Sequence, residues 1–190
     1  MKLWQQRNLV LGVLAIFLYV GAEVSIGSFL VNYFSQPYIA GLTEKAAAVY
    51  VSFYWGAAMV GRFIGSALLT KLRTGPVLGV AAIIAALLVT ASMLSFGNIA
   101  MWTIIAVGLF NSIMFPSIFT LGIAGLGHLT GEGSGWLIAG IVGGAIVPVV
   151  QGALADNIGI HHAFILPVLC YLYIVYYGFS GSRPRRTVAA

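Results

Sequence analysis

Polar side chains inside long apolar stretches are the residues of this sequence best placed to do chemistry. Glu23 lies roughly 14 residues into the first apolar run, or about 21 Å along a helix. Polar groups in hydrocarbon are costly, so a carboxyl group at that depth needs a physical reason. Glu23 is therefore a candidate site acid, a proton carrier or a buried structural acid.

A helical wheel separates Glu23 from the other polar residues of its run. At about 100° per residue, one face carries Gly21, Ser25, Ser28, Asn32 and Gln36. The roughly opposite face carries Glu23 with Tyr19, Ile26, Leu30 and Phe34. Either the helix is broken or wound differently near Gly21 or Gly27, or Glu23 faces and pairs with a neighbouring helix. The Ser28 and Asn32 face is the better candidate for lining a polar cavity, and hydrogen bonding between helices is its alternative.

Two later runs contribute further candidates for substrate binding. Asn111 shares a helix face with Phe115, and an amide beside an aromatic ring suits a sugar's hydroxyls and ring face. The alternative for Asn111 is a buried amide bonded across helices. Gln151 lies beyond Pro148, toward the outer end of its run. The candidate substrate-binding residues are Glu23, Ser28, Asn32, Asn111, Phe115 and Gln151.

Arg62 and Pro148 are candidates for gating rather than for substrate contact. Arg62 lies about two turns before the end of its run, where its side chain can extend to the membrane interface. We expect it to be too near that interface to be a partner for Glu23. Pro148 lacks an N–H and clashes with the preceding turn, so it should bend its helix.

The sequence offers little for an enzyme or a metal site. It has no GxSxG, HExxH or P-loop motif, and no pair of carboxylates at a useful spacing. The adjacent His161 and His162, with Asp156 nearby, are only a weak metal signal. We therefore expect no enzymatic activity, no cofactor and no metal site.

The overall composition indicates which surroundings these residues have. Charged residues make up 7% of the chain and apolar residues 61%, against about 25% charged in a typical soluble domain. The mean hydropathy is +1.03. Most of the surface must therefore face a lipid bilayer. The net charge of +5 does not indicate nucleic acid, because no basic stripe carries interleaved stacking aromatics.

Six apolar segments are long enough to cross a bilayer, which takes about 20 residues each. They cover approximately residues 9–33, 46–69, 76–94, 99–126, 135–154 and 163–179. Short connectors make successive helices neighbours, and the alternating pattern of a membrane β-barrel is absent. The sequence therefore predicts an all-α fold in which residues 1–190 form one bundle of six transmembrane helices.

Basic residues outside the spans predict the orientation. They are Lys2, Arg7, Lys45, Lys71, Arg73, Arg183, Arg185 and Arg186. With six spans, all of them except Lys45 fall on one side, which the positive-inside rule assigns to the cytoplasm. Both termini are therefore expected in the cytoplasm.

Small residues recur at four-residue spacing inside two of the spans. The second span has Ala57, Gly61 and Gly65, and the fifth has Gly140 and Gly144 before Pro148. This spacing places small residues on one face, where helix backbones can approach closely. The stripes indicate either ordinary helix contacts or glycine-rich helices that rock during transport.

Several stretches resemble known transporters. YWGAAMVGRFIGSALLTKLRTGPVL, residues 54–78, resembles the segment joining the second and third helices of a major facilitator half, although it lacks the motif's aspartate. GALADNIGIHHAF, residues 152–164, is similar to the same motif and retains Asp156. LYVGAEVSIGSFLVNY, LFNSIMFPSIFTLGIAGLG and GSGWLIAGIVGGAIVPVVQGALAD resemble the second half of the bacterial glucose/galactose transporters. These belong with the fucose permease to a family of sugar–proton symporters.

The resemblance implies a twelve-helix fold in which sugar binds between two six-helix halves, with this chain as helices seven to twelve. Glu23, Asn32, Asn111 and Gln151 match the family's pattern. The family's transporters are about twice this length, so the chain is a fragment, a split half that needs a first-half partner, or a half that dimerises. The resemblance implies hexose transport, with proton symport, in a bacterial inner membrane. The alternative is a membrane subunit or truncation remnant that does not transport.

Overall fold

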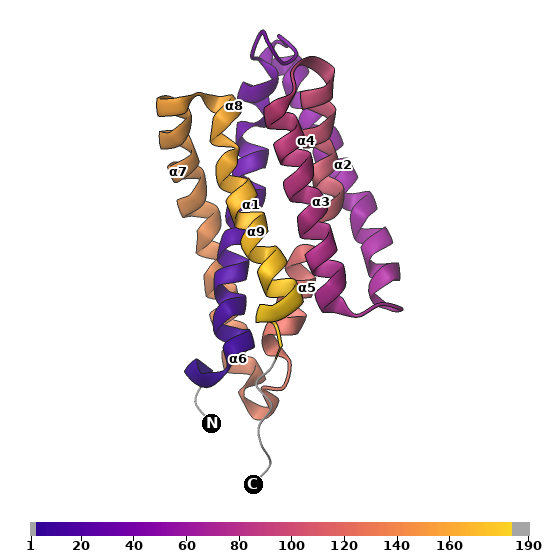
Figure 1. Ribbon diagram of the computed structural model, residues 1–190, viewed down its shortest axis with the longest axis vertical. Coiled ribbons are helices and arrows are strands. Elements are labelled where there is room, and N and C mark those ends of the chain that lie inside the picture. Colours follow the sequence, from indigo (N-terminus) through magenta and orange to yellow (C-terminus); the bar gives the residue numbers. More distant parts are fainter. Residues whose placement is uncertain (1–2, 184–190) are drawn as a thin grey trace.

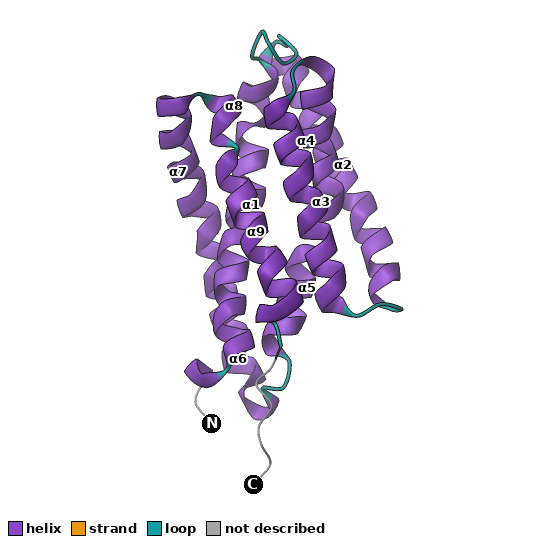
Figure 2. Cartoon of the chain, viewed as in Figure 1, coloured by secondary structure: helices purple, strands orange, loops and turns teal. Residues whose placement is uncertain are grey.

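The computed structural model describes residues 3–183, which fold into helices joined by short turns (Figures 1 and 2). Within this range, six helical spans are long and apolar enough to cross a membrane. They run side by side along the long axis of the molecule (Figure 1). The predicted all-α fold with six transmembrane spans is confirmed.

The first three spans are continuous helices and the last three are interrupted. The described residues start with a short 3-10 turn, η1 (Leu3–Gln5). The three continuous spans are α1 (Arg7–Phe34), α2 (Glu44–Leu69) and α3 (Thr74–Leu94). The fourth span consists of α4 (Gly97–Asn111) and α5 (Met114–Ile123). The fifth comprises η2 (Gly127–Leu129), α6 (Thr130–Ala139), η3 (Gly140–Val142) and α7 (Gly143–Ile158). The sixth comprises α8 (Ile160–Ala163), α9 (Ile165–Tyr176) and a π-helical end, η4 (Tyr177–Gly181).

The break between α4 and α5 has a local cause. Pro116 lacks an N–H and its ring clashes with the carbonyl four residues earlier, which belongs to Ser112. Proline is tolerated in the first turn of a helix, and Pro116 is the third residue of α5. The chain therefore ends one helix at Asn111 and starts another at Met114.

The fifth span begins earlier than hydropathy suggests, because the polar segment TGEGS is already helical in α6. Hydropathy marks where the hydrocarbon begins, and backbone hydrogen bonding continues beyond that point. The change of helix type falls at η3, whereas α7 runs through Pro148 without interruption. At η3 the backbones approach closely, since a Cβ on Gly140 would lie 2.7 Å from the Val13 carbonyl oxygen of α1.

The small-residue stripes lie where backbones meet. A side chain on Gly61 of α2 would collide with the Leu109 carbonyl oxygen of α4, and one on Gly108 would collide with the Tyr54 carbonyl oxygen. Helix α1 packs against α2, α5, α7 and α9. The first helix is therefore the centre of the bundle, and the polar residues on it have neighbours on several sides.

Two spans keep much of their apolar surface uncovered. Only 22% of the residues in the apolar core of α2 are buried, and 28% in the fifth span, against 44% to 56% in the other four. Large exposed side chains include Phe53 and Phe63 on α2 and Val142 and Val149 on the fifth span. These surfaces suit lipid or another membrane-embedded unit.

Several basic residues lie at the ends of the helices. Arg7, Arg73 and Arg183 lie at one end of the bundle, while Lys45 lies at the other, at the start of α2. Lys2, Arg185 and Arg186 lie outside the described residues.

Candidate functional site

A cavity of about 380 Å³ lies between α1, α2 and the break that separates α4 from α5. Its lining residues are Tyr19, Glu23, Arg62, Ser112, Phe115 and Pro116. It combines a carboxyl group, a guanidinium group and an aromatic ring inside a largely apolar bundle. Such groups around one hollow can hold a small polar ligand.

The position of Glu23 resolves the ambiguity of the helical wheel. Helix α1 is unbroken from Arg7 to Phe34, so the hypothesis of a break near Gly21 or Gly27 is wrong. Glu23 instead faces α2 and the start of α5. On the same wheel face, Tyr19 lies near Phe115 of α5 and Phe34 lies near Tyr50 of α2.

Arg62 lies much nearer to Glu23 than expected. Both side chains line the same cavity, so the expectation that Arg62 lies too close to the interface to meet Glu23 is wrong. The reason is reach, because the long arginine side chain carries its charge well away from its own backbone position. Arg62 is exposed and Glu23 is partly buried, which leaves both accessible to a ligand.

The helix break leaves a backbone acceptor without its usual donor at one residue of the cavity wall, Ser112. Since Pro116 has no N–H, the Ser112 carbonyl has no intrahelical donor four residues later. The Ser112 hydroxyl donates to the Leu109 carbonyl at 3.0 Å. Sequence analysis missed Tyr19, Ser112 and Pro116 as cavity residues. Pro116 was the available signal, because a proline inside an apolar span frees the carbonyl one turn earlier.

Phe115 supplies the apolar wall of the cavity. Its ring centroid lies 6.4 Å from that of Tyr19 at an interplanar angle of 56°. Behind it, Phe119 stacks at 6.3 Å and 19°. Phe115 is held between two rings and only partly buried, so its remaining surface is available to the apolar face of a ligand.

Asn111 lies one layer behind the cavity and is fully buried. Its Nδ2 donates to the Tyr54 hydroxyl at 2.9 Å, and its Oδ1 accepts from the Tyr171 hydroxyl at 2.7 Å. The Tyr19 hydroxyl donates to the Asn111 carbonyl at 2.9 Å. The amide therefore joins α2, α4 and α9, while its backbone holds Tyr19 of α1 in the cavity wall.

Ser28 and Asn32 lie on α1 beyond the cavity lining. Both are exposed, and the Asn32 carbonyl accepts a hydrogen bond from Gln36 Nε2 at 3.0 Å. Ser25, on the same wheel face, is instead buried without a partner for its hydroxyl. The polar face of α1 is thus partly open and partly packed.

Gln151 and Pro148 lie on α7, away from the cavity lining. Gln151 is fully buried, and neither polar atom of its amide has a hydrogen-bond partner. An unsatisfied buried amide is costly and calls for an explanation such as a water or a ligand. Pro148 is partly buried within the same helix.

His161 belongs to a different cluster, at the Lys45 end of the bundle. Its Nδ1 lies 3.1 Å from the Tyr33 hydroxyl, which also meets Ser92 Oγ at 3.0 Å. Its ring stacks on Phe96 with centroids 5.2 Å apart. Among residues 3–183, no group of three or more His, Cys, Asp or Glu side chains is arranged to hold a metal.

Comparison with known proteins shows which transporters this arrangement resembles. The chain is 57% identical over 180 residues to a glucose/galactose transporter of Brucella abortus biovar 1 (strain 9-941), covering 95% of this chain and 44% of the relative. It is 36% identical over 163 residues to the L-fucose-proton symporter of Escherichia coli (strain K12), covering 85% of this chain and 37% of the relative. No protein-family model matches. The chain spans less than half the length of these relatives.

Solved structures give the same fold. A crystal structure of FucP, a Major Facilitator Superfamily transporter in the outward conformation, superposes with a TM-score of 0.87 at 34% identity. The match covers 90% of this chain and 42% of that one. A peptide transporter, POT, shares the fold alone, with a TM-score of 0.80 at 19% identity. Over nearly its whole length the chain is therefore similar to about half of these bacterial glucose/galactose and fucose transporters, and it has the fold of that half of a Major Facilitator Superfamily transporter.

Proposed function

We propose that this chain is one half of a transporter that moves a hexose together with protons. The observation that carries the proposal is the cavity in which Glu23, Arg62 and Phe115 meet inside the bundle. Relatives named for glucose, galactose and fucose support a sugar as the substrate. The fucose relative, named as a proton symporter, supports coupling to protons.

The cavity has the groups that a sugar requires. Sugar hydroxyls both donate and accept hydrogen bonds. The Glu23 carboxyl can accept or donate, the Arg62 guanidinium donates, and the Ser112 carbonyl accepts. The partly buried ring of Phe115 can contact the apolar face of a sugar ring. A few placed polar groups against one aromatic wall would orient the sugar.

The cavity would be one side of the complete site. Its partner would be a first-half six-helix unit or a second copy of this chain, and α2 and α7 offer the uncovered surfaces for that contact. In this arrangement the present helices correspond to helices seven to twelve. Ser28, Asn32 and Arg62, which are exposed in the chain alone, would then face the space between the halves. Rocking of one half against the other would open the site alternately to each side.

Glu23 is the proposed proton carrier. An ionisable group within a membrane span marks substrate or proton pathways by default. Arg62 lines the same cavity, so the charge on Glu23 changes the electrostatics of the whole hollow. A proton on Glu23 removes its attraction for Arg62 and would leave the guanidinium free to bind the sugar. Proton and sugar binding would in this way be coupled.

We further propose that the chain lies in a bacterial inner membrane with both termini in the cytoplasm. The described residues Arg7, Lys71, Arg73 and Arg183 lie at one end of the spans and Lys45 at the other. A surplus of Lys and Arg in short connectors marks the cytoplasmic side.

The test is uptake of labelled galactose by cells that lack hexose uptake and express this chain, alone or with a candidate first half. In the active assembly, Glu23→Gln should keep sugar exchange but abolish proton-driven accumulation. Loss of sugar binding would instead make Glu23 a site residue. Glu132→Gln, at an exposed acid of α6, is the matched control and should leave transport unchanged. Normal accumulation by Glu23→Gln would refute the proton role, and absence of uptake with every partner would favour a subunit that does not transport.

A further inference from the structure

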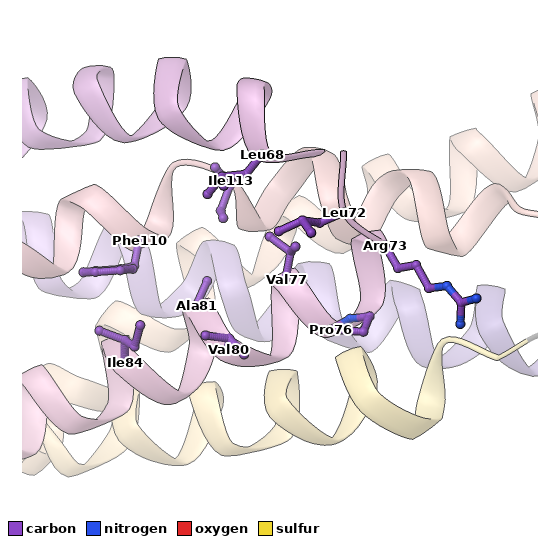
Figure 3. A pocket seen from close by; sticks show the side chains of 10 residues that line it. All are labelled: Leu68, Leu72, Arg73, Pro76, Val77, Val80, Ala81, Ile84, Phe110 and Ile113. Atoms are coloured by element: carbon purple, nitrogen blue, oxygen red, sulfur yellow. The ribbon is translucent and has the colours of Figure 1, made fainter. Parts of the chain in front are cut away.

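A second hollow, of about 390 Å³, shares no lining residue with the Glu23 cavity. It is formed by the last turn of α2, the connector to α3, the first half of α3 and the end of α4. Nine of its ten lining residues are apolar, and the tenth is Arg73 (Figure 3). We call it the α2–α3 groove.

The groove exists because α2 loses its neighbour. Gly61 and Gly65 let α2 touch Leu109 and Ile113 directly. The fourth span breaks at that point, and Leu68, about one turn further along α2, is exposed and lines the groove. The end of α2 stands apart from the rest of the bundle (Figure 1), and a gap remains between it and α3.

The depth of the groove matches one leaflet of a bilayer. Its α3 wall runs from Pro76 to Ile84, about 12 Å along the helix at 1.5 Å per residue. Half of a hydrocarbon core roughly 30 Å thick is about 15 Å. Pro76 and Val80 are both exposed, so the groove opens along the outer side of α3. A hollow of this depth with an apolar lining suits a single hydrocarbon chain, because its walls offer water few hydrogen-bond partners.

The open end of the groove is positively charged. Arg73 lines it, and its guanidinium extends away from the apolar side chains (Figure 3). Lys71 lies two residues earlier in the same connector. The four acids of the chain are Glu23, Glu44, Glu132 and Asp156. None of them falls between residues 62 and 84, so this part of the sequence supplies no local countercharge.

We propose that the α2–α3 groove binds one anionic phospholipid. An acyl chain occupies the apolar hollow, and the headgroup phosphate is held by Arg73 and Lys71. Basic side chains at the membrane surface attract anionic lipids, and arginine pairs well with phosphate. Because Ile113 belongs to the groove and Ser112 to the Glu23 cavity, the bound lipid supports the helix break that shapes the sugar cavity.

The test is native mass spectrometry of the purified chain after reconstitution with equal amounts of dioleoylphosphatidylglycerol and dioleoylphosphatidylcholine. Phosphatidylglycerol should be retained in preference. Lys71→Ala and Arg73→Ala should each lower its retention about fivefold. Arg183→Ala removes an exposed basic residue from the same end of the bundle and should change nothing.

A second pair of variants tests the apolar hollow. Val80→Trp should fill the groove and reduce retention of both lipids, whereas Leu87→Trp, at an exposed site of α3 outside the groove, should not. Glycerol 3-phosphate should fail to displace the lipid, and displacement would show a site for soluble phosphates instead. Equal retention of the two lipids, or unchanged retention in Arg73→Ala, would overturn the proposal. Helical content from circular dichroism confirms that each variant is folded.

Discussion

Replacing Asn111 with alanine tests whether this residue builds the cavity wall or contacts the sugar. The change removes the hydrogen bonds to the Tyr54 and Tyr171 hydroxyls, at 2.9 and 2.7 Å, and both tyrosines are fully buried. Hydrogen bonds between membrane helices average about 0.6 kcal/mol, with a maximum near 1.7. Two such bonds give a loss of about 1 to 3 kcal/mol in the free energy of unfolding.

A compensating variant separates the cost of losing the two hydrogen bonds from the cost of leaving the buried tyrosine hydroxyls unpaired. Asn111→Leu combined with Tyr54→Phe and Tyr171→Phe leaves no polar side-chain group unpaired in this cluster. Replacing all partners by apolar groups can be nearly neutral, whereas removing one partner costs the desolvation of the others. The triple variant should therefore recover most of the stability that Asn111→Ala loses. Reversible unfolding in mixed micelles with rising SDS, followed by circular dichroism, measures both.

Two outcomes would contradict the structural role of Asn111. If Asn111→Ala unfolds at the same SDS fraction as the parent, the tyrosine cluster does not stabilise the bundle. If the folded triple variant loses sugar binding in an assembly that binds sugar, Asn111 contacts the substrate and does not act only through Tyr19. Retained binding in the triple variant supports a structural role behind the cavity.

Three further predictions follow from packing and topology. Gly61→Ala should destabilise the chain by about 1 to 3 kcal/mol, because its methyl group would collide with the facing helix backbone. The control Gly56→Ala, with nothing within 4 Å of the added methyl group, should be neutral or stabilising by up to about 1 kcal/mol. Equal effects of the two variants in SDS unfolding would contradict the packing. In cells, a membrane-impermeant maleimide should label Lys45→Cys from outside and Arg73→Cys only after permeabilisation, and the reverse pattern would invert the topology. Cys170, which is 2% exposed, should react with maleimide only after denaturation, and labelling of the folded chain would show that α9 is looser than described.

Some residues of the cavity can be predicted from the pattern within a single helix, and others cannot. Depth along a span was enough to single out Glu23, because the length of the preceding apolar run can be counted. Its neighbour Arg62 could not be found in this way, since a helical wheel describes one helix and says nothing of which helix lies opposite. The aromatic candidate Phe115 does line the cavity with Glu23. The break beside it could have been read from Pro116, whose missing N–H acts locally.

The pattern of residues along the chain was sufficient to predict the membrane environment, the six spans and the asymmetry of basic residues between Lys45 and the other connectors. These depend on the apolar content of single segments and on the requirement that a backbone in lipid satisfies its own hydrogen bonds within a helix. Two features became visible only in the folded chain: Asn111 bonds to tyrosines 57 and 60 residues away, and the end of α2 and the start of α3 line a groove. Such contacts depend on how glycine-rich helices approach and where one of them breaks, which are relations between segments that the pattern within each segment does not encode.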